Sequence, residues 1–288
     1  MSCPLCNENR TAPSWLGSTF YQGEEFTYIQ CLSCNSLYCD PMPTDLVLEQ
    51  MYGLNYGKNF GVDLVVEDPK SPQHVIEWLK KEKVGTFVDY GCGAGSLLQE
   101  AKKLNWQAIG VEFNQEVAKT VEQNTGAIIF NRNSVNQLQE PIADILHLGD
   151  AIEHLTQLNS QMPKILSLIK PGGLLLAQGP LENNTNLFTF TLSCLRSLHR
   201  RRTEMPPYHV ILATAKGQKI LFQQFGLEEL EYSITEVSWP APNRLSFSEN
   251  LNPRSVALFL LRRCSQAFSA LQPNSWGNRY FYAGRWKG

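Results

Sequence analysis

The sequence predicts an α/β fold built on a doubly wound, mostly parallel sheet, and three observations support this prediction. From Thr86 onward, short apolar runs alternate with amphipathic stretches, which is the pattern of strands joined by helices. Closely spaced glycines follow the first apolar run, as they do where a strand turns sharply into a helix. A short cysteine-bearing segment, residues 1–43, precedes this alternation and indicates a small additional domain.

The N-terminal segment carries two Cys-x-x-Cys pairs, Cys3 with Cys6 and Cys31 with Cys34, separated by 24 residues. Two such turns can place four thiolates tetrahedrally around one Zn²⁺. Two short alternating runs between the pairs fit the strands of a ribbon that the metal closes, because so small a segment cannot fold alone. We therefore predict a structural zinc ribbon, with redox-active pairs or coincidental cysteines as the alternative.

Residues 44–82 are predicted to form a linker with helical segments. Thr44 or Asp45 is a candidate cap for a first helix, and Ser71 and Pro72 open a second helix with apolar residues at helical spacing. The glycine- and tyrosine-rich stretch between these helices has a length typical of a lid or of a segment without regular structure. Its tyrosines either cover a ligand or pack the linker.

The first predicted strand, 86–90, leads into a turn in which Gly91, Gly93 and Gly95 alternate with other residues. Glycines at such a turn let backbone N–H groups approach a nucleotide-like ligand. Glu112 ends the second predicted strand, and a carboxylate at this place accepts hydrogen bonds from both ribose hydroxyls. The Gly-x-Gly-x-Gly spacing differs from the Gly-x-Gly-x-x-Gly of dinucleotide sites, so a ligand other than NAD is expected.

The alternation of strands and helices continues through the middle of the chain. Right-handed crossovers between parallel strands bring the carboxyl ends of the strands to one edge of the sheet, where ligands bind. We expect Glu112 and Asp150, which end or follow two of these strands, to lie at that edge. The further strands are predicted at 108–112, 127–130, 144–149 and 173–179, and the helices near 95–104, 114–124, 136–140 and 157–169.

An apolar helical pattern at 186–202 ends in the cationic run 199–202, inside a predicted cap insertion at about 183–209. The cations either complement the negative end of the helix dipole or form a site for a phosphate-bearing or membrane-bound acceptor. The remaining elements are a helix at 215–225, a strand at 227–235, a helix at 253–271 and a strand at 278–286.

The composition narrows the class of protein. With 25 basic and 27 acidic residues and a pI of about 6.2, the chain has no overall field that attracts nucleic acid or an anionic membrane. No apolar run is long enough to span a membrane, and the N-terminal residues lack the pattern of a signal peptide. We expect a cytoplasmic protein, in which the eight cysteines are reduced or bound to metal.

Three motifs carry a resemblance to a known family. The run D-Y-G-C-G-A-G at 89–95 resembles the first motif of the class I S-adenosylmethionine-dependent methyltransferases. The run D-A-I-E-H-L at 150–155 resembles the end of that family's fourth strand, and L-I-K-P-G-G at 168–173 resembles the turn into its fifth. The cysteine ribbon resembles one that precedes the catalytic domain in bacterial methyltransferases of polysaccharide and natural-product pathways.

The resemblance implies a Rossmann-like sheet of seven strands with an antiparallel last strand, and a catalytic domain at residues 83–288. It implies an enzyme that transfers a methyl group from S-adenosylmethionine to oxygen or carbon of a small-molecule acceptor, either sugar-derived or a secondary metabolite. The cofactor-binding residues that it implies are Asp89, Gly91, Cys92, Gly93, Gly95, Glu112, Phe113, Ser134, Gly149 and Asp150.

Methylation of a hydroxyl or a carbon requires a base that removes a proton from the acceptor. His209, in a proline-rich turn after the cap helix, is the preferred candidate, because imidazole takes up a proton near neutral pH; a structural role is the alternative. Tyr208, His154 and Glu182 are further candidates. Where the family often presents an acid to adenine, this chain has Asn131 and Ser134, whose side-chain oxygens also accept hydrogen bonds.

Two other functions are compatible with the same motifs. An RNA-modifying methyltransferase would use the ribbon to grip nucleic acid, but the ribbon carries Glu8, Glu24 and Glu25 against Arg10, which argues against it. A non-catalytic scaffold would retain cofactor binding and have lost the acceptor chemistry. The acceptor and the oligomeric state do not follow from the sequence, because acceptor pockets are built from variable caps and loops.

Overall fold

The structure is a computed structural model of the chain. It describes residues 2–51, 73–131, 134–138, 141–198, 203–204, 206–238, 245, 252–272 and 274–288. The stretch 52–72, for which a lid or linker is predicted, and the cationic run 199–202 lie outside the described residues, so both stay predictions. Contacts among the described residues divide the chain into two compact units.

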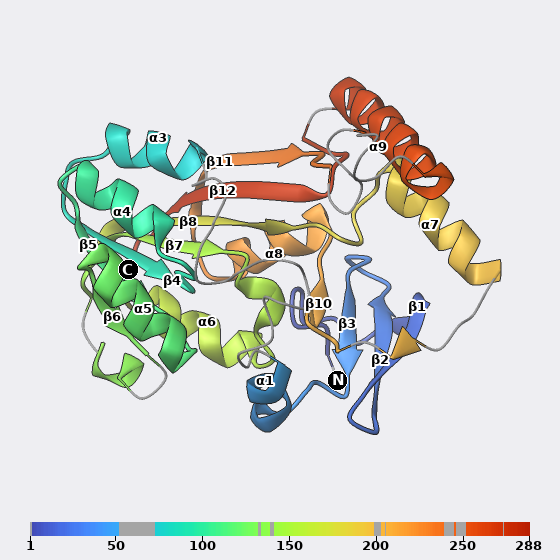
Figure 1. Cartoon of the computed structure of the whole chain (residues 1–288), viewed down its shortest axis with the longest axis horizontal. Coiled ribbons are helices and arrows are strands. Elements are labelled where there is room, and N and C mark those ends of the chain that lie inside the picture. Colours follow the sequence, from blue (N-terminus) through green and yellow to red (C-terminus); the bar gives the residue numbers. More distant parts are fainter. Residues whose placement is uncertain are drawn as a thin grey trace. The chain divides into compact units, whose positions relative to one another are not determined.

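Unit 1 is assembled from three separate segments, residues 1–42, 179–222 and 232–280. Its described part contains a five-stranded sheet in the order β10-β3-β2-β1-β9 (Figure 1). All neighbouring strands in it are antiparallel except β9, which joins β1 in parallel. The strands are β1 (Thr11–Tyr21), β2 (Glu24–Cys31), β3 (Leu37–Asp40), β9 (Thr203–Glu204) and β10 (Ile211–Leu212).

This sheet is larger than the two short ribbon strands that the sequence predicts. Strand β3 follows the second cysteine pair directly, and β10 pairs with it through Ile211 opposite Tyr38 and Leu212 opposite Leu37. Strands of two residues have no hydrophobic period, and their partners are far away in the sequence. Neither β9 nor β10 could therefore be found from a local pattern.

The helices of unit 1 include α7 (Leu187–Leu198), which contacts α9 (Pro253–Leu271), as Figure 1 also shows. Helix α9 has the bounds that the sequence predicts. The side chain of Asn252 caps its first turn by accepting a hydrogen bond from the N–H of Ser255 at 2.9 Å, and Pro253 occupies the first position. Helix α8 (Ala215–Gln224) begins in this unit.

The predicted fold class is confirmed. In the described residues, a mixed seven-stranded sheet has the order β11-β12-β8-β7-β4-β5-β6, and the strands from β4 to β8 are parallel. Strand β12 lies between β8 and β11. The strands are β4 (Thr86–Tyr90), β5 (Gln107–Val111), β6 (Ile128–Phe130), β7 (Ala143–Gly149), β8 (Ile169–Pro180), β11 (Glu228–Thr235) and β12 (Arg279–Arg285).

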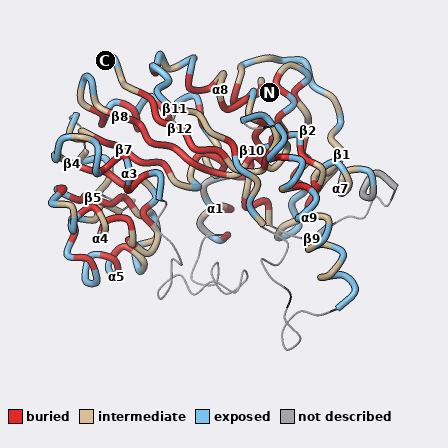
Figure 2. Tube along the Cα trace, turned by 90° about the horizontal axis from the view of Figure 1, so that it is seen from above, coloured by how far each residue is buried: buried red, intermediate tan, exposed pale blue. Residues whose placement is uncertain are grey.

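Unit 2 holds the apolar core of the parallel strands. Strands β4 and β7 are buried over most of their length, as Figure 2 shows in red, and Phe87, Leu98 and Ile145 are among the fully buried side chains. The indole N–H of Trp106 donates to the carbonyl of Leu79 at 3.1 Å, which fixes α3 against this core. The helices of unit 2 are α1 (Asp45–Met51), α3 (Gln73–Lys81), α4 (Ser96–Lys103), α5 (Gln115–Thr125) and α6 (Leu158–Leu166).

The strand order indicates where a sheet of this kind binds a ligand. From β4 the chain moves outward to β5 and β6, and then returns to place β7 and β8 on the other side of β4. Right-handed crossovers therefore put α4 and α5 on one face of the sheet and α6 on the other. The order reverses between β4 and β7, and ligands of such sheets bind at the carboxyl ends of the strands at this point.

Two elements differ from the sequence prediction. The helix expected at 136–140 is only a short turn of 3₁₀-helix at Val135–Gln137 in the described residues. Strand β8 begins at Ile169, four residues before the predicted start, because Ile169 pairs with Ala143 and Leu174 pairs with Ile145. The extra residues of β8 form a bulge that contains the Lys-Pro-Gly-Gly run, for which the sequence predicts a turn before the strand.

Candidate functional site

The glycine turn after β4 has a backbone that requires glycine. The φ angles of Gly91, Gly93 and Gly95 are +87°, +49° and +78°, in the region that side chains disfavour. The N–H of Gly91 donates to the carbonyl of Val111 at 2.8 Å, which ties the turn to β5. A Cβ built on Gly93 would meet no atom within 4 Å, so this side of the turn is open to a ligand.

Glu112 closes the same turn from the end of β5. Its Oε2 accepts a hydrogen bond from the N–H of Gly93 at 3.2 Å, and its Oε1 accepts one from the N–H of Asn114 at 2.9 Å. Burial raises the pKa of the carboxyl, and the two backbone donors oppose that rise. Each oxygen retains a lone pair, so the carboxylate can accept further bonds from a pair of hydroxyls.

Phe113 follows Glu112 and is largely exposed, at 44% of its surface. Its ring lies edge-on to the ring of Tyr90, with centroids 5.7 Å apart. Asn114 then caps α5 by accepting hydrogen bonds from the N–H groups of Glu116 and Val117. The end of β5 therefore offers a carboxylate and an aromatic face next to each other.

Beneath the turn, Asp89 forms a buried pair with His147, a residue that the sequence analysis did not select. Nδ1 of His147 lies 2.7 Å from Oδ1 of Asp89, and both side chains are 5% exposed. Nε2 of His147 is buried without a hydrogen-bond partner among the described residues. A signal was present in the sequence, because His147 is an ionisable residue inside the apolar run 145–148 of strand β7.

The imidazole of His147 packs under the end of its own strand. A Cβ built on Gly149 would lie 2.5 Å from Cε1 of His147, so only glycine fits above the ring. Asp150 follows with φ +48°, a left-handed conformation that is rare for a residue other than glycine, and its N–H donates to Gln178 at 3.0 Å. This strained strand end lies at the switch point of the sheet.

The other predicted residues of unit 2 lie in turns after the strands. Ser134 Oγ accepts a hydrogen bond from the N–H of Asn131 at 2.9 Å, which closes the turn after β6. Glu153, which is buried, and His154 belong to a 3₁₀ turn (Ile152–His154) after β7. Both turns follow the carboxyl ends of parallel strands.

In unit 1, His209 forms a second pair with a carboxylate. Its Nδ1 lies 2.7 Å from Oε2 of Glu182, and the side chains are 31% and 36% exposed. The hydroxyl of Tyr28 donates to the carbonyl of His209 at 2.7 Å, which fixes the backbone there. Tyr208 beside it is buried. The structure thus pairs His209 with Glu182, which the sequence gives as a further candidate base.

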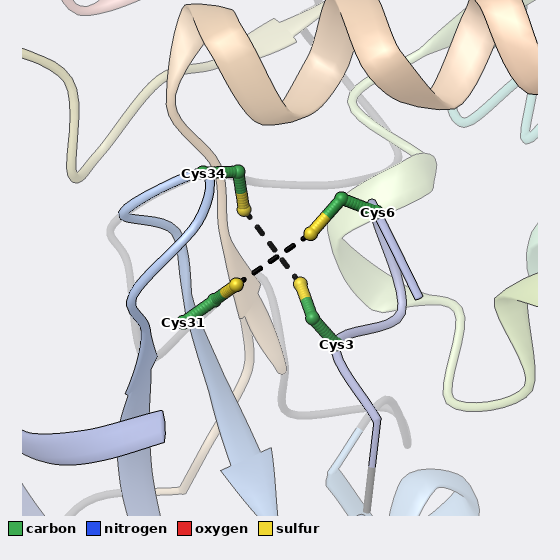
Figure 3. A group of neighbouring side chains, drawn as sticks. All are labelled: Cys3, Cys6, Cys31 and Cys34. Atoms are coloured by element: carbon green, nitrogen blue, oxygen red, sulfur yellow. Dashed lines mark hydrogen bonds between the residues drawn. The ribbon is translucent and has the colours of Figure 1, made fainter. Parts of the chain in front are cut away.

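The four cysteines of unit 1 converge as predicted (Figure 3). Sγ of Cys3 lies 3.7 Å from Sγ of Cys34, and Sγ of Cys6 lies 3.5 Å from Sγ of Cys31. Four sulfurs at about 2.3 Å from a tetrahedral Zn²⁺ would be separated by roughly 3.8 Å. The cluster is therefore consistent with a zinc ribbon, and all four thiols are free of disulfides.

Hydrogen bonds support the second cysteine turn. A hydrogen bond from the Cys3 thiol lowers the pKa of Cys34, with a further contribution from Ser36, whereas the same bond raises the pKa of Cys3. The hydroxyl of Thr214 donates to the carbonyl of Cys34 at 2.6 Å, and its N–H donates to Ser36 Oγ at 3.0 Å. A Cβ on Gly217 would lie 2.4 Å from Ser36 Oγ, so glycine lets α8 approach the second cysteine turn.

Comparison with known proteins places the parallel strands in a family. Residues 68–232 match a family model described as "Methyltransferase domain". Two curated relatives, each named ubiquinone biosynthesis O-methyltransferase, come from Rhodopseudomonas palustris strains BisA53 and BisB18 and are 28% and 29% identical over 111 residues. The match covers 37% of this chain and 44% and 43% of the relatives, which is less than half of their length.

Solved structures share the fold at lower identity. Magnesium protoporphyrin IX methyltransferase from Synechocystis PCC 6803, solved with bound SAH, is 11% identical with a TM-score of 0.53, over 84% of this chain and 99% of its own. The cyclopropane synthase MmaA2 from Mycobacterium tuberculosis is 14% identical with a TM-score of 0.50, over 86% and 100%. At such identities the likeness shows the fold alone. In the described part of the chain, no helix is both long and apolar enough to cross a membrane.

Proposed function

Because the chain belongs to the class I S-adenosylmethionine-dependent methyltransferases, we propose that it transfers a methyl group from this cofactor to a small-molecule acceptor, at oxygen or carbon. The observation that supports the proposal most is the Glu112 carboxylate, held by the N–H of Gly93 beside an open glycine turn. Its remaining lone pairs suit the two ribose hydroxyls of the cofactor.

The residues of unit 2 fit the other parts of the cofactor. The turn formed by Gly91, Cys92, Gly93 and Gly95 would let the cofactor approach its backbone, because the left-handed glycines place no side chain there, and Asp89 is held by His147 at the end of the strand that precedes it. The adenine would meet the exposed ring of Phe113, with Ser134, Gly149 and Asp150 as polar or backbone neighbours. When bound, the cofactor supplies a methyl group on a sulfonium, so these residues bind and align rather than activate the donor.

The acceptor requires a base, and we assign this role to His209. A proton on Nδ1 that is donated to Glu182 makes Nε2 of the same ring the proton acceptor, and the carboxylate then stabilises the imidazolium that forms. Both side chains are partly exposed, so the ring can exchange its proton with solvent after each turnover. Tyr208 and His154 are the alternative bases.

The acceptor class rests on two supports. The two curated relatives carry the name of O-methyltransferases, which favours oxygen over carbon. The cysteine ribbon resembles that of enzymes in polysaccharide and natural-product pathways, which favours a sugar-derived acceptor or a secondary metabolite. The ribbon itself is proposed to hold one structural Zn²⁺ through Cys3, Cys6, Cys31 and Cys34.

Calorimetric titration of the purified protein with S-adenosylmethionine, S-adenosylhomocysteine and NAD⁺ tests the proposal. We expect binding of both adenosyl ligands and none of NAD⁺. Glu112→Gln should weaken binding by about 10- to 100-fold, because hydrogen bonds to a charged acceptor are lost. Glu122→Gln, an exposed acid on the neighbouring helix α5, is the matched control and should bind as the wild type does.

The possible results separate the alternatives. Absence of binding to either adenosyl ligand by folded protein would overturn the cofactor assignment. Cofactor binding without transfer to any acceptor in a broad screen would indicate the non-catalytic scaffold, and salt-dependent binding of RNA would indicate the RNA-modifying enzyme. Zinc quantified on the same sample should be close to one per chain, and metal-free folded protein would refute the structural zinc site.

A further inference from the structure

Helix α9 of unit 1 is packed with its apolar side outward. Leu260, Phe268 and Leu271 are 56%, 49% and 73% exposed, although leucine and phenylalanine on an ordinary surface helix face the core. The buried side chains of the helix are instead Arg262, Ser265 and Ser269. We define the outer face of α9 as six exposed apolar residues that share one side of the helix, Ala257, Leu260, Cys264, Ala267, Phe268 and Leu271.

Helix geometry collects these residues into one stripe. At 3.6 residues per turn, the six side chains of the outer face fall within an arc of roughly 100°. Arg254 and Arg263, both exposed, fall just beyond the two edges of that arc. From Ala257 to Leu271 the stripe is about 21 Å long. The arrangement is an apolar band with an arginine on each flank.

The inner face explains why α9 is held in this orientation. Arg262 forms an ion pair with Glu236, and Ser265 Oγ donates to the same carboxylate at 2.9 Å. Ser269 Oγ donates to the carbonyl of Trp276 at 2.6 Å, and the guanidinium of Arg262 lies 3.6 Å from the ring centroid of Phe188 on α7. These polar contacts anchor the helix, so the apolar side chains are left on the outside.

Helix α7 extends the surface. It contacts α9, and Phe190 and Cys194 on it are exposed, Phe190 at 66%. Arg254 and Arg263 are exposed on α9, and the sequences of α7 and α9 contain no aspartate or glutamate, although the whole chain has a net charge of −2. The surface is therefore locally cationic as well as apolar.

We propose that the outer face of α9, with the exposed residues of α7, docks this protein onto a bilayer that contains anionic phospholipids. The apolar band would enter the boundary between headgroups and acyl chains, while Arg254 and Arg263 reach the phosphates at its two edges. A second copy of the chain fits less well, because it would bring the same arginines together without an acid on either helix. The surface depends on neither the cofactor nor the metal.

Flotation of the full-length, zinc-loaded protein with vesicles tests the proposal. We expect it to float with phosphatidylcholine vesicles that contain phosphatidylglycerol, more strongly at low than at high salt, and only weakly with phosphatidylcholine alone. Phe268→Glu and Leu260→Glu should each lower the partition coefficient at least about ten-fold. Arg254→Gln and Arg263→Gln should each lower it about five-fold, on the anionic vesicles only.

Leu46→Glu is the matched control, because Leu46 is also an exposed leucine on a helix, α1, and its loss should leave flotation unchanged. Circular dichroism of every variant verifies the fold. Failure of the wild type to float at low salt, or equal flotation of Phe268→Glu, would overturn the proposal. A dimer that Phe268→Glu converts to a monomer would assign the face to a second copy, and binding of an acidic polypeptide in place of vesicles would assign it to a protein partner.

Discussion

Unit 2 and unit 1 each contain a histidine whose Nδ1 lies 2.7 Å from a carboxylate oxygen. In unit 2 the pair is Asp89 with His147, and each side chain is 5% exposed. In unit 1 the pair is Glu182 with His209, and about a third of each side chain is exposed. The two pairs share their distance and their chemistry and differ in contact with water.

The difference in burial separates two roles for the same pair of groups. A buried proton has no route to solvent, so the Asp89–His147 pair holds β4 against β7 beneath the glycine turn. The Glu182–His209 pair can release a proton to water, which a base must do once in every catalytic cycle. Distance alone would have assigned both pairs to catalysis.

The largest effect should follow from breaking the buried pair. His147→Leu leaves the Asp89 carboxylate buried without its partner, which costs about 3–5 kcal/mol of the free energy of unfolding. Chemical denaturation measures the loss. The double variant Asp89→Leu, His147→Leu should recover most of it, because no charge remains buried. His74→Leu, a half-exposed histidine, is the control and should change stability by less than about 0.5 kcal/mol.

Removal of the exposed histidine should act on rate instead of stability. His209→Ala should lower kcat about 10²- to 10³-fold, the range typical of a lost general base, while cofactor affinity and the denaturation midpoint stay near wild-type values. Single-turnover kinetics with an active acceptor, combined with calorimetry, measure the two properties. A variant that retains full kcat would remove His209 from the mechanism and move attention to Tyr208 and His154.

A smaller effect is expected from its carboxylate partner. Glu182→Gln keeps the size of the side chain but removes the charge that favours imidazolium, so kcat should fall about 10-fold and the lower limb of its pH profile should shift to more acidic pH. Glu182→Asp should restore part of the rate. A merely structural Glu182 would change stability without moving the pH profile, and that result would contradict its positioning role.

A third carboxylate sharpens the comparison, because Glu112 is partly buried without a histidine. Burial raises the pKa of the Glu112 carboxyl in the folded protein above its value in the unfolded chain, so protonation of this carboxyl stabilises the fold. This stabilisation is complete below the pKa of the unfolded chain and is lost as the pH rises through the pKa of the folded protein. Without cofactor, Glu112→Gln should therefore melt at the same temperature as the wild type in acid and above it at pH 8. Scanning calorimetry across this range measures the difference, and a parallel pH dependence of the two proteins would contradict the raised pKa.

The fold of unit 2 is predicted well from the sequence, because the motifs that predict it lie close together along the chain. Strand β4, the glycine turn and Glu112 lie within one strand–helix–strand unit, and each bond between them joins residues fewer than about 30 positions apart. The partner of Asp89 does not follow in the same way, because His147 is 58 residues away. Its register against Asp89 depends on which strands become neighbours, and this is a property of the whole sheet.

Unit 1 is less predictable for a related reason. The spacing of the four cysteines predicts their convergence, since metal ligands impose a pattern on the sequence. The bounds of α9 also follow from its cap and its period. The side of α9 that is buried does not, because the ion pair between Arg262 and Glu236 reverses the usual rule that the apolar side faces inward.

The hydrogen bond from Thr214 to the carbonyl of Cys34 joins residues 180 positions apart, and this has a consequence for the growing polypeptide. The second cysteine turn leaves the ribosome early, whereas Thr214 and strand β10, which support it, leave only after the parallel strands β4 to β8 have been translated. A nascent chain therefore carries thiols that have no support from Thr214 during most of its synthesis. Metal captured at that stage would protect them from oxidation until translation delivers their partners.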